Sequence, residues 1–383
     1  MTGRLLLAGV STRAAAESAA SAGFSVTALD AFADLDQHPS VRALSLPHDF
    51  GRRFTPSAAA RAAKTLDCDS VAYLSSFENH PRALATLAAG RRLLGNLPSI
   101  VRQVRDPRLV ARALGREGFV APAITLDAPR RGDWLVKPIA SGGGRRVRRW
   151  KAGARVPRGS YLQERIDGTP GSVVFVAADG CAVPLGVSRQ ICGDQAFGAT
   201  GFQYCGNILA PVRDAQFQNG DVLIRHAIDV AKVVAAAFAL VGVNGVDFIA
   251  QEGSAYAIEV NPRFSASMEL VERAHGLSVF GAHATACVDG KLPAFDLLRA
   301  QRNIDSVGKA IVFARRDVVI GDTRSWIDAG LRDVPHPHER IDAGRPVCTV
   351  FASGRDAAAC YAELVRKANR VYAELAGWER NVA

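Results

Sequence analysis

The chain has no apolar run long enough to cross a lipid bilayer. Its longest uncharged apolar stretch lies between Lys232 and Asp247, whereas a spanning helix needs about 20 such residues. We also do not expect residues 1–11, "MTGRLLLAGVS", to be an export signal, because their apolar part is brief and "TRAAAES" follows at once. We therefore expect a buried first strand there and a cytoplasmic protein without a membrane span.

Cysteine is scarce and lacks the spacing of a metal or disulfide motif. The seven cysteines form no CxxC pair, and an odd number cannot all pair within one chain. Without an export signal, this pattern predicts reduced thiols. Cys192 and Cys205 lack a nearby basic partner, so we do not expect them to act as nucleophiles.

The N-terminal part lacks the GxGxxG fingerprint, so dinucleotide binding is not supported. "RLLLAGV" at 4–10 predicts a strand, followed by a helix that ends near Gly23 and a second strand that reaches Asp30. A further strand at 70–76 and a helix at 81–90, with proline first and glycine last, continue the pattern. These elements predict a small parallel α/β domain. Further along, the sequence predicts a helix at 107–118 with Asp106 as its N-cap, and a long helix at 221–242 that Gly242 closes.

Acidic residues are outnumbered, with 37 Asp and Glu against 47 Lys and Arg, which gives a net charge of +10. Such an excess fits nucleic acid, anionic small molecules or simply a solvated surface. The densest basic cluster, "GRRVRRWK" at 144–151, adjoins a glycine run, which favours phosphate over DNA. A nucleic-acid-binding module stays open as an alternative, and steep salt dependence of polynucleotide binding would support it.

The stretch "YAIEVNPRF" at 256–264 reads as a strand with an unusual end. Alternation along a strand puts Glu259, Asn261 and Arg263 on one face, and Pro262 ends the ladder. The preceding "NGVDFIAQEGSA" predicts a hairpin partner that carries Asp247. Asp247 faces Glu259 only if the loop around Gly253 is odd, with three or five residues, because a one-residue slip reverses every side chain.

Two opposed carboxylates repel unless a cation lies between them. Carboxylate and amide oxygens suit Mg²⁺, which proteins commonly share with nucleotide phosphates. The alternative is that Asp247 and Glu259 are exposed residues of a two-sided hairpin.

A second candidate for phosphate contact is "LVKPIASGGGRR". Lys137 ends an apolar strand, and Gly142, Gly143 and Gly144 follow, whose backbone N–H groups could surround phosphate. The alternative for the glycine triplet is a flexible hairpin tip. "QERIDG" at 163–168 is either a hinge whose backbone binds adenine or an interdomain connector.

The order of these features resembles an ATP-grasp domain over roughly residues 104–290: Lys before a glycine-rich loop, then "QERIDG", "VDF" and "EVNPR". The resemblance implies an α/β protein with an ATP-grasp fold, an N-terminal Rossmann-like (pre-ATP-grasp) α/β domain and a C-terminal α+β segment. We expect the N-terminal domain at 1–103, the ATP-grasp domain at 104–290 with a lid at about 120–163, and at 291–383 a segment that completes the ATP-grasp core and ends in a helix.

The resemblance also implies roles for individual residues. An earlier cation that contacts the nucleotide would fall near Arg108, although "RDPR" departs from the family's pattern, and so does "GTPGS" where a ribose-binding Glu would follow the hinge. From the residues alone, the loop at 188–207 is a substrate-facing wall in which Arg189 is the first residue to test. By resemblance, Lys137 contacts the phosphates beneath Gly142, Gly143 and Gly144; Gln163, Glu164 and Ile166 hold adenine; Asp247, Glu259 and Asn261 bind Mg²⁺ or Mn²⁺; and Arg263 contacts the transition state or an acyl phosphate.

The terminal segments resemble predicted ATP-dependent carboligases related to biotin carboxylase and carbamoyl-phosphate synthetase, and more distantly tyramine–glutamate and D-alanine ligases. This implies a carboxylate–amine ligase that uses ATP and acts on small molecules, with cofactor biosynthesis as a setting and a homodimer left open. A biotin-carboxylase-like reaction with bicarbonate is the alternative. From another class, an ATP-binding regulatory or nucleic-acid-binding protein also stays open. The only methionines are Met1 and Met268, so a Met-Lys-Met carrier site is absent. His336 and His338 flank a proline in a turn, and we expect a structural role for them.

Overall fold

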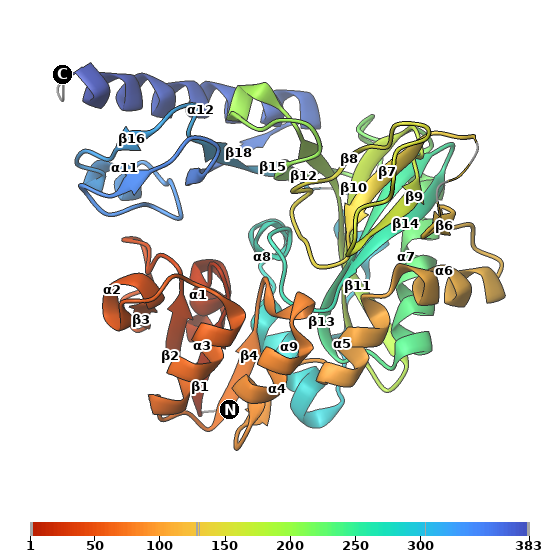
Figure 1. Ribbon diagram of the computed structural model, residues 1–383, viewed down its shortest axis with the longest axis horizontal. Helices are drawn as coiled ribbons and strands as arrows, with labels where there is room; N and C mark the ends of the chain where they lie inside the picture. The colour runs from red at the N-terminus through yellow and green to blue at the C-terminus, as the bar shows by residue number, and fades with distance from the viewer. Residues whose placement is uncertain (1–2, 128, 130, 303, 381–383) are drawn as a thin grey trace.

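The computed structural model describes residues 3–127, 129, 131–302 and 304–380 (Figure 1). The N-terminal part forms a parallel sheet in the order β3-β2-β1-β4-β5. Leu5, Leu6 and Leu7 on the central strand are fully buried, as expected where helices cover both faces. The elements are β1 (Arg4–Ala8), α1 (Arg13–Ser21), β2 (Ser25–Asp30), β3 (Arg42–Ser45), α2 (Leu46–Phe50), α3 (Pro56–Ala62), β4 (Ser70–Tyr73), η2 (Phe77–Asn79), α4 (Pro81–Ala88), β5 (Arg92–Leu93) and α5 (Pro98–Val104).

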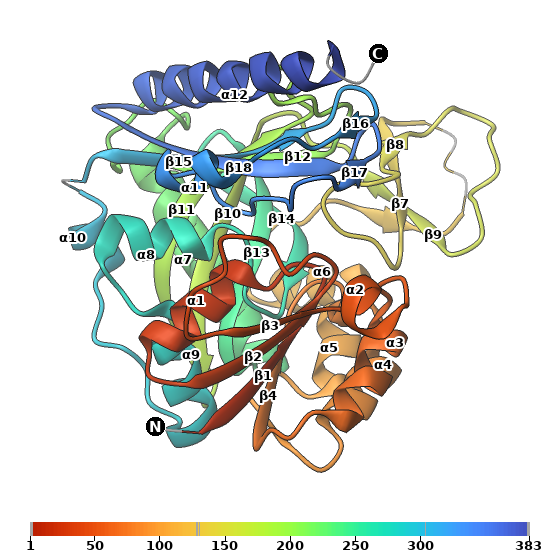
Figure 2. The ribbon, with the colours of Figure 1, turned by 90° about the vertical axis from the view of Figure 1, so that its left-hand side faces the viewer.

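The carboxyl ends of these parallel strands meet at one edge of the sheet. β1 lies between β2 and β4, so the strand order reverses between β1 and β4. In open α/β sheets, ligands bind in the crevice outside such a reversal point. Figures 1 and 2 show that this edge faces the C-terminal strands.

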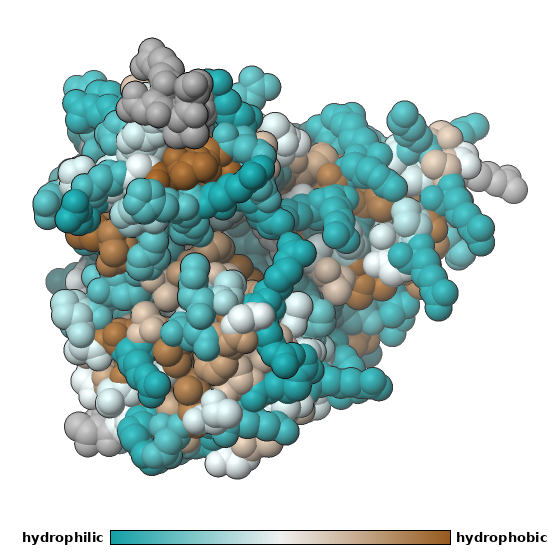
Figure 3. All heavy atoms as spheres, turned by 60° about the vertical axis from the view of Figure 1, so that its left-hand side comes forward, coloured by the Kyte–Doolittle hydropathy of each residue, from teal (hydrophilic) through white to brown (hydrophobic). Residues whose placement is uncertain are grey.

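A small antiparallel sheet forms the lid and projects from the body (Figure 2). Its strands follow the order β6-β9-β7-β8, and the helix α6 (Pro107–Arg116) leads into it. Asp106 caps α6 by accepting a hydrogen bond from the backbone N–H of Arg108 (3.0 Å), as the sequence predicts. In the space-filling view of Figure 3 the lid stands apart from the body and carries mostly hydrophilic residues. The strands are β6 (Ile124–Thr125), β7 (Trp134–Pro138), β8 (Arg148–Arg149) and β9 (Ser160–Glu164).

A seven-stranded antiparallel sheet in the order β14-β13-β10-β11-β12-β15-β18 unites the rest of the chain. The strands are β10 (Thr169–Ala178), β11 (Cys181–Cys192), β12 (Tyr204–Leu209), β13 (Gly242–Gln251), β14 (Ser254–Asn261), β15 (Ser306–Phe313) and β18 (Pro346–Gly354). The helices that accompany it are α7 (Gly220–Phe238), α8 (Met268–His275), α9 (Val279–Asp289), α10 (Leu297–Ala300), α11 (Arg324–Asp328) and α12 (Ala357–Arg380), and β16 (Val318–Val319) pairs with β17 (Arg340–Ile341).

α7 ends earlier than the sequence pattern suggested. The pattern closed the helix at Gly242, but Gly242 begins β13 and the helix stops at Phe238. Ala239 adopts a left-handed conformation (φ +48°), and Leu240 N–H donates to the carbonyl of Ala235, so the helix carbonyls are capped without glycine. Among the described residues, no helix combines the length and apolarity that a membrane span requires.

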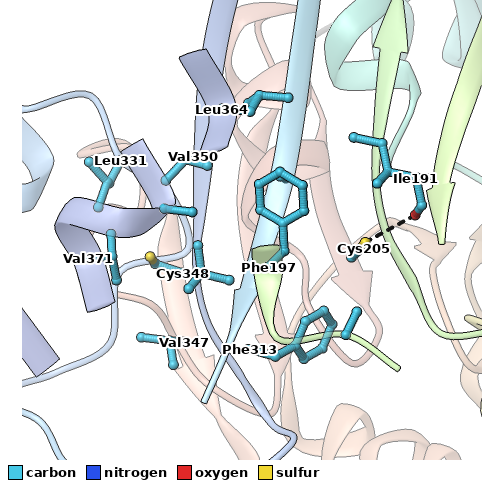
Figure 4. Packing of buried hydrophobic residues seen from close by; sticks show 14 of the residues in the cluster. Ile191, Phe197, Cys205, Phe313, Leu331, Val347, Cys348, Val350, Leu364 and Val371 are labelled. Atoms are coloured by element: carbon cyan, nitrogen blue, oxygen red, sulfur yellow. Dashed lines mark hydrogen bonds between the residues drawn. The ribbon is translucent and has the colours of Figure 1, made fainter. Parts of the chain in front are cut away.

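The C-terminal segment packs on the far strands of the large sheet. Figure 4 shows the core between β12, β15, β18 and α12, in which Phe197, Val350 and Leu364 meet. Cys205 belongs to this core and donates its thiol to the Ile191 carbonyl (3.2 Å). Burial raises the pKa of the Cys205 thiol to about 11, which suits a structural residue better than a nucleophile.

Candidate functional site

The β13–β14 hairpin ends in a tight turn of two residues. Glu252 and Gly253 both have positive φ angles (+50° and +80°), and Gln251 pairs with Ser254 across the turn. This is the geometry of a type I′ turn, which matches the twist of antiparallel strands. The prediction of an odd loop around Gly253 was therefore wrong.

Asp247 and Glu259 nevertheless face each other, because the hairpin contains a β-bulge. Phe248 pairs with Ala257, the register then shifts, and Asp247 pairs with Glu259. Ile258 is the extra residue, and one extra residue reverses the faces of everything beyond it. The predicted pairing of the carboxylates is thus confirmed, while the reason for it differs from the expected loop length.

Polar groups surround the Asp247 carboxylate on this sheet face. Asn261 donates from Nδ2 to Oδ2 of Asp247 (2.9 Å), and Gln190 donates from Nε2 to Oδ1 (2.8 Å). Burial, together with the facing Glu259, raises the pKa of Asp247 to about 6. The negative charges of Asp247 and Glu259 are thus close enough to repel each other.

A divalent cation fits this set of groups. The atoms of Asp247, Glu259 and Asn261 that can bind a metal ion are oxygens, and a cation would relieve the repulsion that raises the pKa of Asp247. Among the described residues, no group of three or more His, Cys, Asp or Glu side chains converges as a complete metal site. The protein would therefore supply part of the coordination, as is usual for Mg²⁺ that also binds phosphate.

Lys137 on β7 reaches the bulged residue. Its Nζ atom donates to the Ile258 carbonyl (3.1 Å) and to Oε1 of Gln163 (3.0 Å), and both side chains are buried. Because Ile258 is the bulged residue of an edge strand, its carbonyl is free for these contacts. Burial lowers the pKa of Lys137, while the charge of Glu259 opposes that shift.

Arg105, rather than Arg108, is the arginine that lies at the carboxylates. Its Nη1 atom contacts Oε1 of Glu259 (2.5 Å) and the Val260 carbonyl (3.0 Å). Its Nη2 atom donates to Oδ1 of Asn79 (2.9 Å) and to the Ser141 carbonyl (3.1 Å).

Arg108 turns away from the site and makes an ion pair with its own N-cap residue, Asp106 (2.8 Å). Burial alone would raise the pKa of Glu259, but the charges of Arg105 and Lys137 outweigh burial and hold that pKa below its usual value.

Arg263 is held by a residue of the N-terminal domain. Its Nη2 atom lies 2.7 Å from Oε1 of Glu78, and the Glu78 side chain is 1% exposed. The same Nη2 atom contacts Oδ1 of Asn261 (3.3 Å). The Nε atom of Arg263 and Oε2 of Glu78 are buried without a hydrogen-bond partner in the described part of the chain. The guanidinium is therefore fixed but still has a donor to offer.

The glycine loop rests on the segment before β12. The Gly143 carbonyl accepts a hydrogen bond from the Tyr204 N–H (3.1 Å). Gly144 has φ +69°, and a Cβ atom there would lie 1.8 Å from the Phe202 carbonyl oxygen. Gly144 is thus required by a close backbone approach, whereas Gly142 has open space around it.

A cleft opens beside these groups, between α6, the lid and β14. Apolar side chains such as Val110, Ile124 and Ala257 form its walls, and Arg105, Lys137, Gln163 and Glu259 lie along it. This combination is typical of a pocket for a flat, partly polar ligand.

Besides Arg108, three residues named from the sequence lie outside this assembly. Glu164 is exposed and accepts a hydrogen bond from Ala123 N–H (3.0 Å), and neither Glu164 nor Ile166 lines the cleft. Gln190 contacts Asp247, so its neighbour Arg189 on β11 faces the other side of the sheet.

A known family matches the part of the chain that includes α6, the lid and the β13–β14 hairpin. Residues 104–267 match the family model described as the ATP-grasp domain. The chain carries an ATP-grasp domain. The match confirms the family that the order of the sequence motifs indicated, and ATP with Mg²⁺ is the cofactor pair that such a domain implies.

Solved structures share the fold of this ATP-grasp chain at low sequence identity. The L-amino acid ligase from Bacillus licheniformis superposes with a TM-score of 0.67 at 16% identity, over 96% of this chain and 97% of that one. The N5-carboxyaminoimidazole ribonucleotide synthetase from Thermotoga maritima gives 0.63 at 16%, over 96% and 97%. The biotin carboxylase from Campylobacter jejuni gives 0.67 at 12%, over 94% and 89%. These likenesses confirm the fold class, and no curated protein matches the sequence.

Four residues of this candidate site were missed from the sequence. Glu78 and Asn79 follow β4, where polar side chains after a buried strand signal the carboxyl edge of a parallel sheet. Arg105 is the first arginine of the "RDPR" motif. Only the N-cap role of Asp106 could have shown that the side chain of Arg108, the second arginine, pairs with Asp106 instead of entering the site. Gln190 could have been found from the alternation of β11 once the face of Asp247 was fixed.

Proposed function

We propose that this ATP-grasp protein is an ADP-forming ligase that joins a small-molecule carboxylate to an amine through an acyl phosphate. The observation that carries the proposal is the bulged hairpin, which puts Asp247 opposite Glu259 and brings Asn261 and Arg263 to the same end of the sheet. The neighbouring cleft, with its apolar walls and buried Lys137, supports ATP as the ligand.

The proposed roles follow the contacts. Adenine would occupy the apolar cleft beside Gln163. The phosphate oxygens would be contacted by Lys137 and Arg105. The loop with Gly142, Gly143 and Gly144 would cover the phosphates. Asp247, Glu259 and Asn261 would hold Mg²⁺, which neutralises phosphate charge when bound.

In the first half-reaction a carboxylate oxygen attacks the γ-phosphorus and ADP leaves. Arg263, fixed by Glu78, would stabilise the charge on the transferring phosphoryl group. In the second half-reaction the amine nitrogen attacks the acyl carbon, phosphate leaves and the amine loses a proton.

The test is ADP release from purified protein against panels of carboxylic acids and amines, with two variants that should fail differently. Glu259→Gln keeps the shape but loses the charge, so activity should fall and recover partly with added Mg²⁺. Arg263→Lys keeps the charge but loses the planar fork, so Mg-ATP should still bind while phosphoryl transfer slows. Wild-type rates and wild-type Mg-ATP affinity in both variants would refute the proposal.

A biotin-carboxylase-like reaction is the second candidate, supported by the superposition on the Campylobacter jejuni enzyme over most of both chains. ADP release that requires bicarbonate and no organic acid would favour it over the carboxylate–amine ligase.

The proposed setting is cofactor biosynthesis in the cytoplasm, with small molecules as substrates. The proposed assembly is a homodimer. The basic residues at 144–151 lie in the lid next to the glycine loop, where they would meet an anionic substrate or nucleotide rather than nucleic acid. Sedimentation would test the assembly, and the salt dependence of polynucleotide binding would test the alternative partner.

A further inference from the structure

A second group of charged residues, outside the cleft, lies where the N-terminal sheet meets α8 and the C-terminal strands. Arg13 is fully buried, and its guanidinium contacts Glu269 (2.8 Å), Asp333 (2.9 Å) and Glu17 (3.0 Å). Lys309 on β15 contacts the other oxygen of Glu269 (2.6 Å). The proposed ATP chemistry uses none of these side chains.

Three of the aspartates near Arg13 are occupied by structural contacts. Asp30 accepts from Thr12 Oγ1 (2.6 Å) and from the backbone N–H groups of Phe32 and Ala33. Asp36 accepts from the backbone N–H groups of Asp333 and Val334, and Asp333 accepts from Thr349 Oγ1 as well as from Arg13. The Asp36 carboxylate thus ties the loop after β2 to the C-terminal segment.

Asp34 differs from its neighbours. It is 7% exposed, and its Oδ2 atom has no hydrogen-bond partner in the described part of the chain. Gln37, which closes a turn with Asp34, has both Nε2 and Oε1 buried and unpaired as well. Burial and the charges of Asp333 and Asp30 raise the pKa of Asp34, and the charge of Arg13 offsets only part of that rise.

The missing group is a hydrogen-bond donor rather than a metal ion. The described carboxylates do not converge as metal ligands. Asp34 offers acceptors, and the amide of Gln37 offers an acceptor and a donor. A nitrogen that carries protons, such as an ammonium or an amino group on a heterocycle, satisfies the oxygen atoms of Asp34 and Gln37.

The position of Asp34 relates it to the proposed reaction site. Glu78 follows β4, Arg13 follows β1 and Asp34 follows β2, and these strands are neighbours in the order β4, β1, β2. Two strand spacings of about 4.8 Å each separate the loop with Glu78 from the loop with Asp34 by roughly 10 Å along the carboxyl edge.

A row of polar residues also crosses the large sheet, from β13 to β15. Asp247 pairs with Ser172, Ser172 with Ser188, and Asn207 with Lys309, so these side chains share one face. Asn207 Nδ2 donates to Ser188 Oγ (2.9 Å). The row runs from the proposed metal ligands to Lys309, whose partner Glu269 contacts Arg13.

We propose that the amine substrate is an elongated molecule with nitrogen at both ends. Its reacting amine lies near Arg263 and Glu78, and its far end donates hydrogen bonds to Asp34 and Gln37, roughly 10 Å away. This inference rests on the proposed ligase function and names the shape and the far-end chemistry of the nucleophile.

The test uses linear diamines as molecular rulers, added to the full-length protein with Mg²⁺ and a non-hydrolysable ATP analogue. Backbone geometry gives about 1.2 Å per bond in an extended chain, so a diamine of about seven carbon atoms spans the interval and ethylenediamine does not. Calorimetry should show at least tenfold tighter binding of the long diamine by the wild type. Asp34→Asn should weaken that binding by about ten- to a hundred-fold, the usual range for a charged hydrogen bond.

Asp289→Asn, an exposed carboxylate at the end of α9, is the matched control and should bind both diamines as the wild type does. Gln37→Leu is the second variant, which keeps the inference testable if Asp34→Asn does not fold, and it should also lose the preference for the long diamine. Equal binding of the two diamines by the wild type, or an unchanged preference in the folded variants, would overturn the inference.

The outcome is distinguishable from a failure of the proposed function. Hydroxylamine is a small nucleophile that cannot reach Asp34, so ADP release with hydroxylamine and the acid panel should be the same in the wild type and Asp34→Asn. If the wild type shows no such release, the ligase proposal fails. If release is normal but the diamine preference survives in Asp34→Asn, only the elongated substrate is refuted.

Discussion

Replacing Arg105 with Ala is the sharpest perturbation of the site, because this guanidinium joins three parts of the fold. It contacts Glu259 and the Val260 carbonyl on β14, Asn79 in the N-terminal domain and the Ser141 carbonyl at the start of the glycine loop. The side chains of Arg105 and Glu259 are only 11% and 24% exposed, so the substitution leaves a partly buried carboxylate without its main cation.

The cost can be bounded from these contacts. Removing one partner of a buried ion pair costs about 3–5 kcal/mol. Residual exposure of Glu259 and the nearby charge of Lys137 reduce this cost, so we expect a loss of about 3 kcal/mol in the free energy of unfolding at neutral pH.

The sign with pH follows from the lowered pKa of Glu259. A carboxylate with a depressed folded pKa stabilises the fold above its unfolded pKa and loses that contribution as the pH falls through the folded value. The difference between wild type and Arg105→Ala should therefore shrink in acid.

Arg108→Ala is the matched control, because Arg108 lies three residues after Arg105 on the same segment. It is exposed, and among the described residues its ion pair is with Asp106 alone. Urea unfolding of the ligand-free proteins, followed by fluorescence and circular dichroism, measures the difference. We expect Arg108→Ala to change stability by less than about 1 kcal/mol. Equal losses in the two variants, or a loss in Arg105→Ala that is independent of pH, would refute the reasoning.

Three further predictions concern single side chains. Lys137→Ala should weaken ATP binding about ten- to a hundred-fold without unfolding the protein, as measured by calorimetry, because it removes one charged phosphate contact. Gly144→Ala should lower ATP affinity and shift the lid loop, because its Cβ atom would lie 1.8 Å from the Phe202 carbonyl oxygen; Gly142→Ala is the control with open space, and equal affinities would count against the close approach. Asp34 has a raised folded pKa, so its charge destabilises the fold increasingly as the pH rises above its unfolded pKa; Asp34→Asn should therefore be more stable than wild type at neutral pH but not in strong acid, as denaturation at the two pH values will show.

Local features were predictable from the sequence because their causes are local. Asp106 caps α6 as expected, and the strand character of 256–261 follows from alternation and the proline after it. The pairing of Asp247 with Glu259 was also predicted, although through an odd loop. A two-residue turn with positive φ angles and a bulge at Ile258 give the same pairing, and sequence alternation alone cannot separate the two solutions.

Contacts between distant segments were not predictable. Arg105 meets Glu259 across 154 residues, and the choice between Arg105 and Arg108 depends on which one Asp106 captures. Asp34 and Gln37 looked like ordinary loop residues in the sequence. Their unpaired atoms are buried only because the C-terminal segment covers this loop, and the sequence does not show that contact.

The partners of Arg13 also bear on how the chain folds as it is made. Arg13 emerges from the ribosome 320 residues before Asp333, with which it shares a hydrogen bond of 2.9 Å. At typical synthesis rates of about 5–20 residues per second, this interval lasts roughly 16 to 64 s. During that time water must hydrate the Arg13 guanidinium in the first α/β unit. The C-terminal segment therefore covers the carboxyl edge of the N-terminal sheet only at the last stage of synthesis, after β15 and β18 have joined the large sheet.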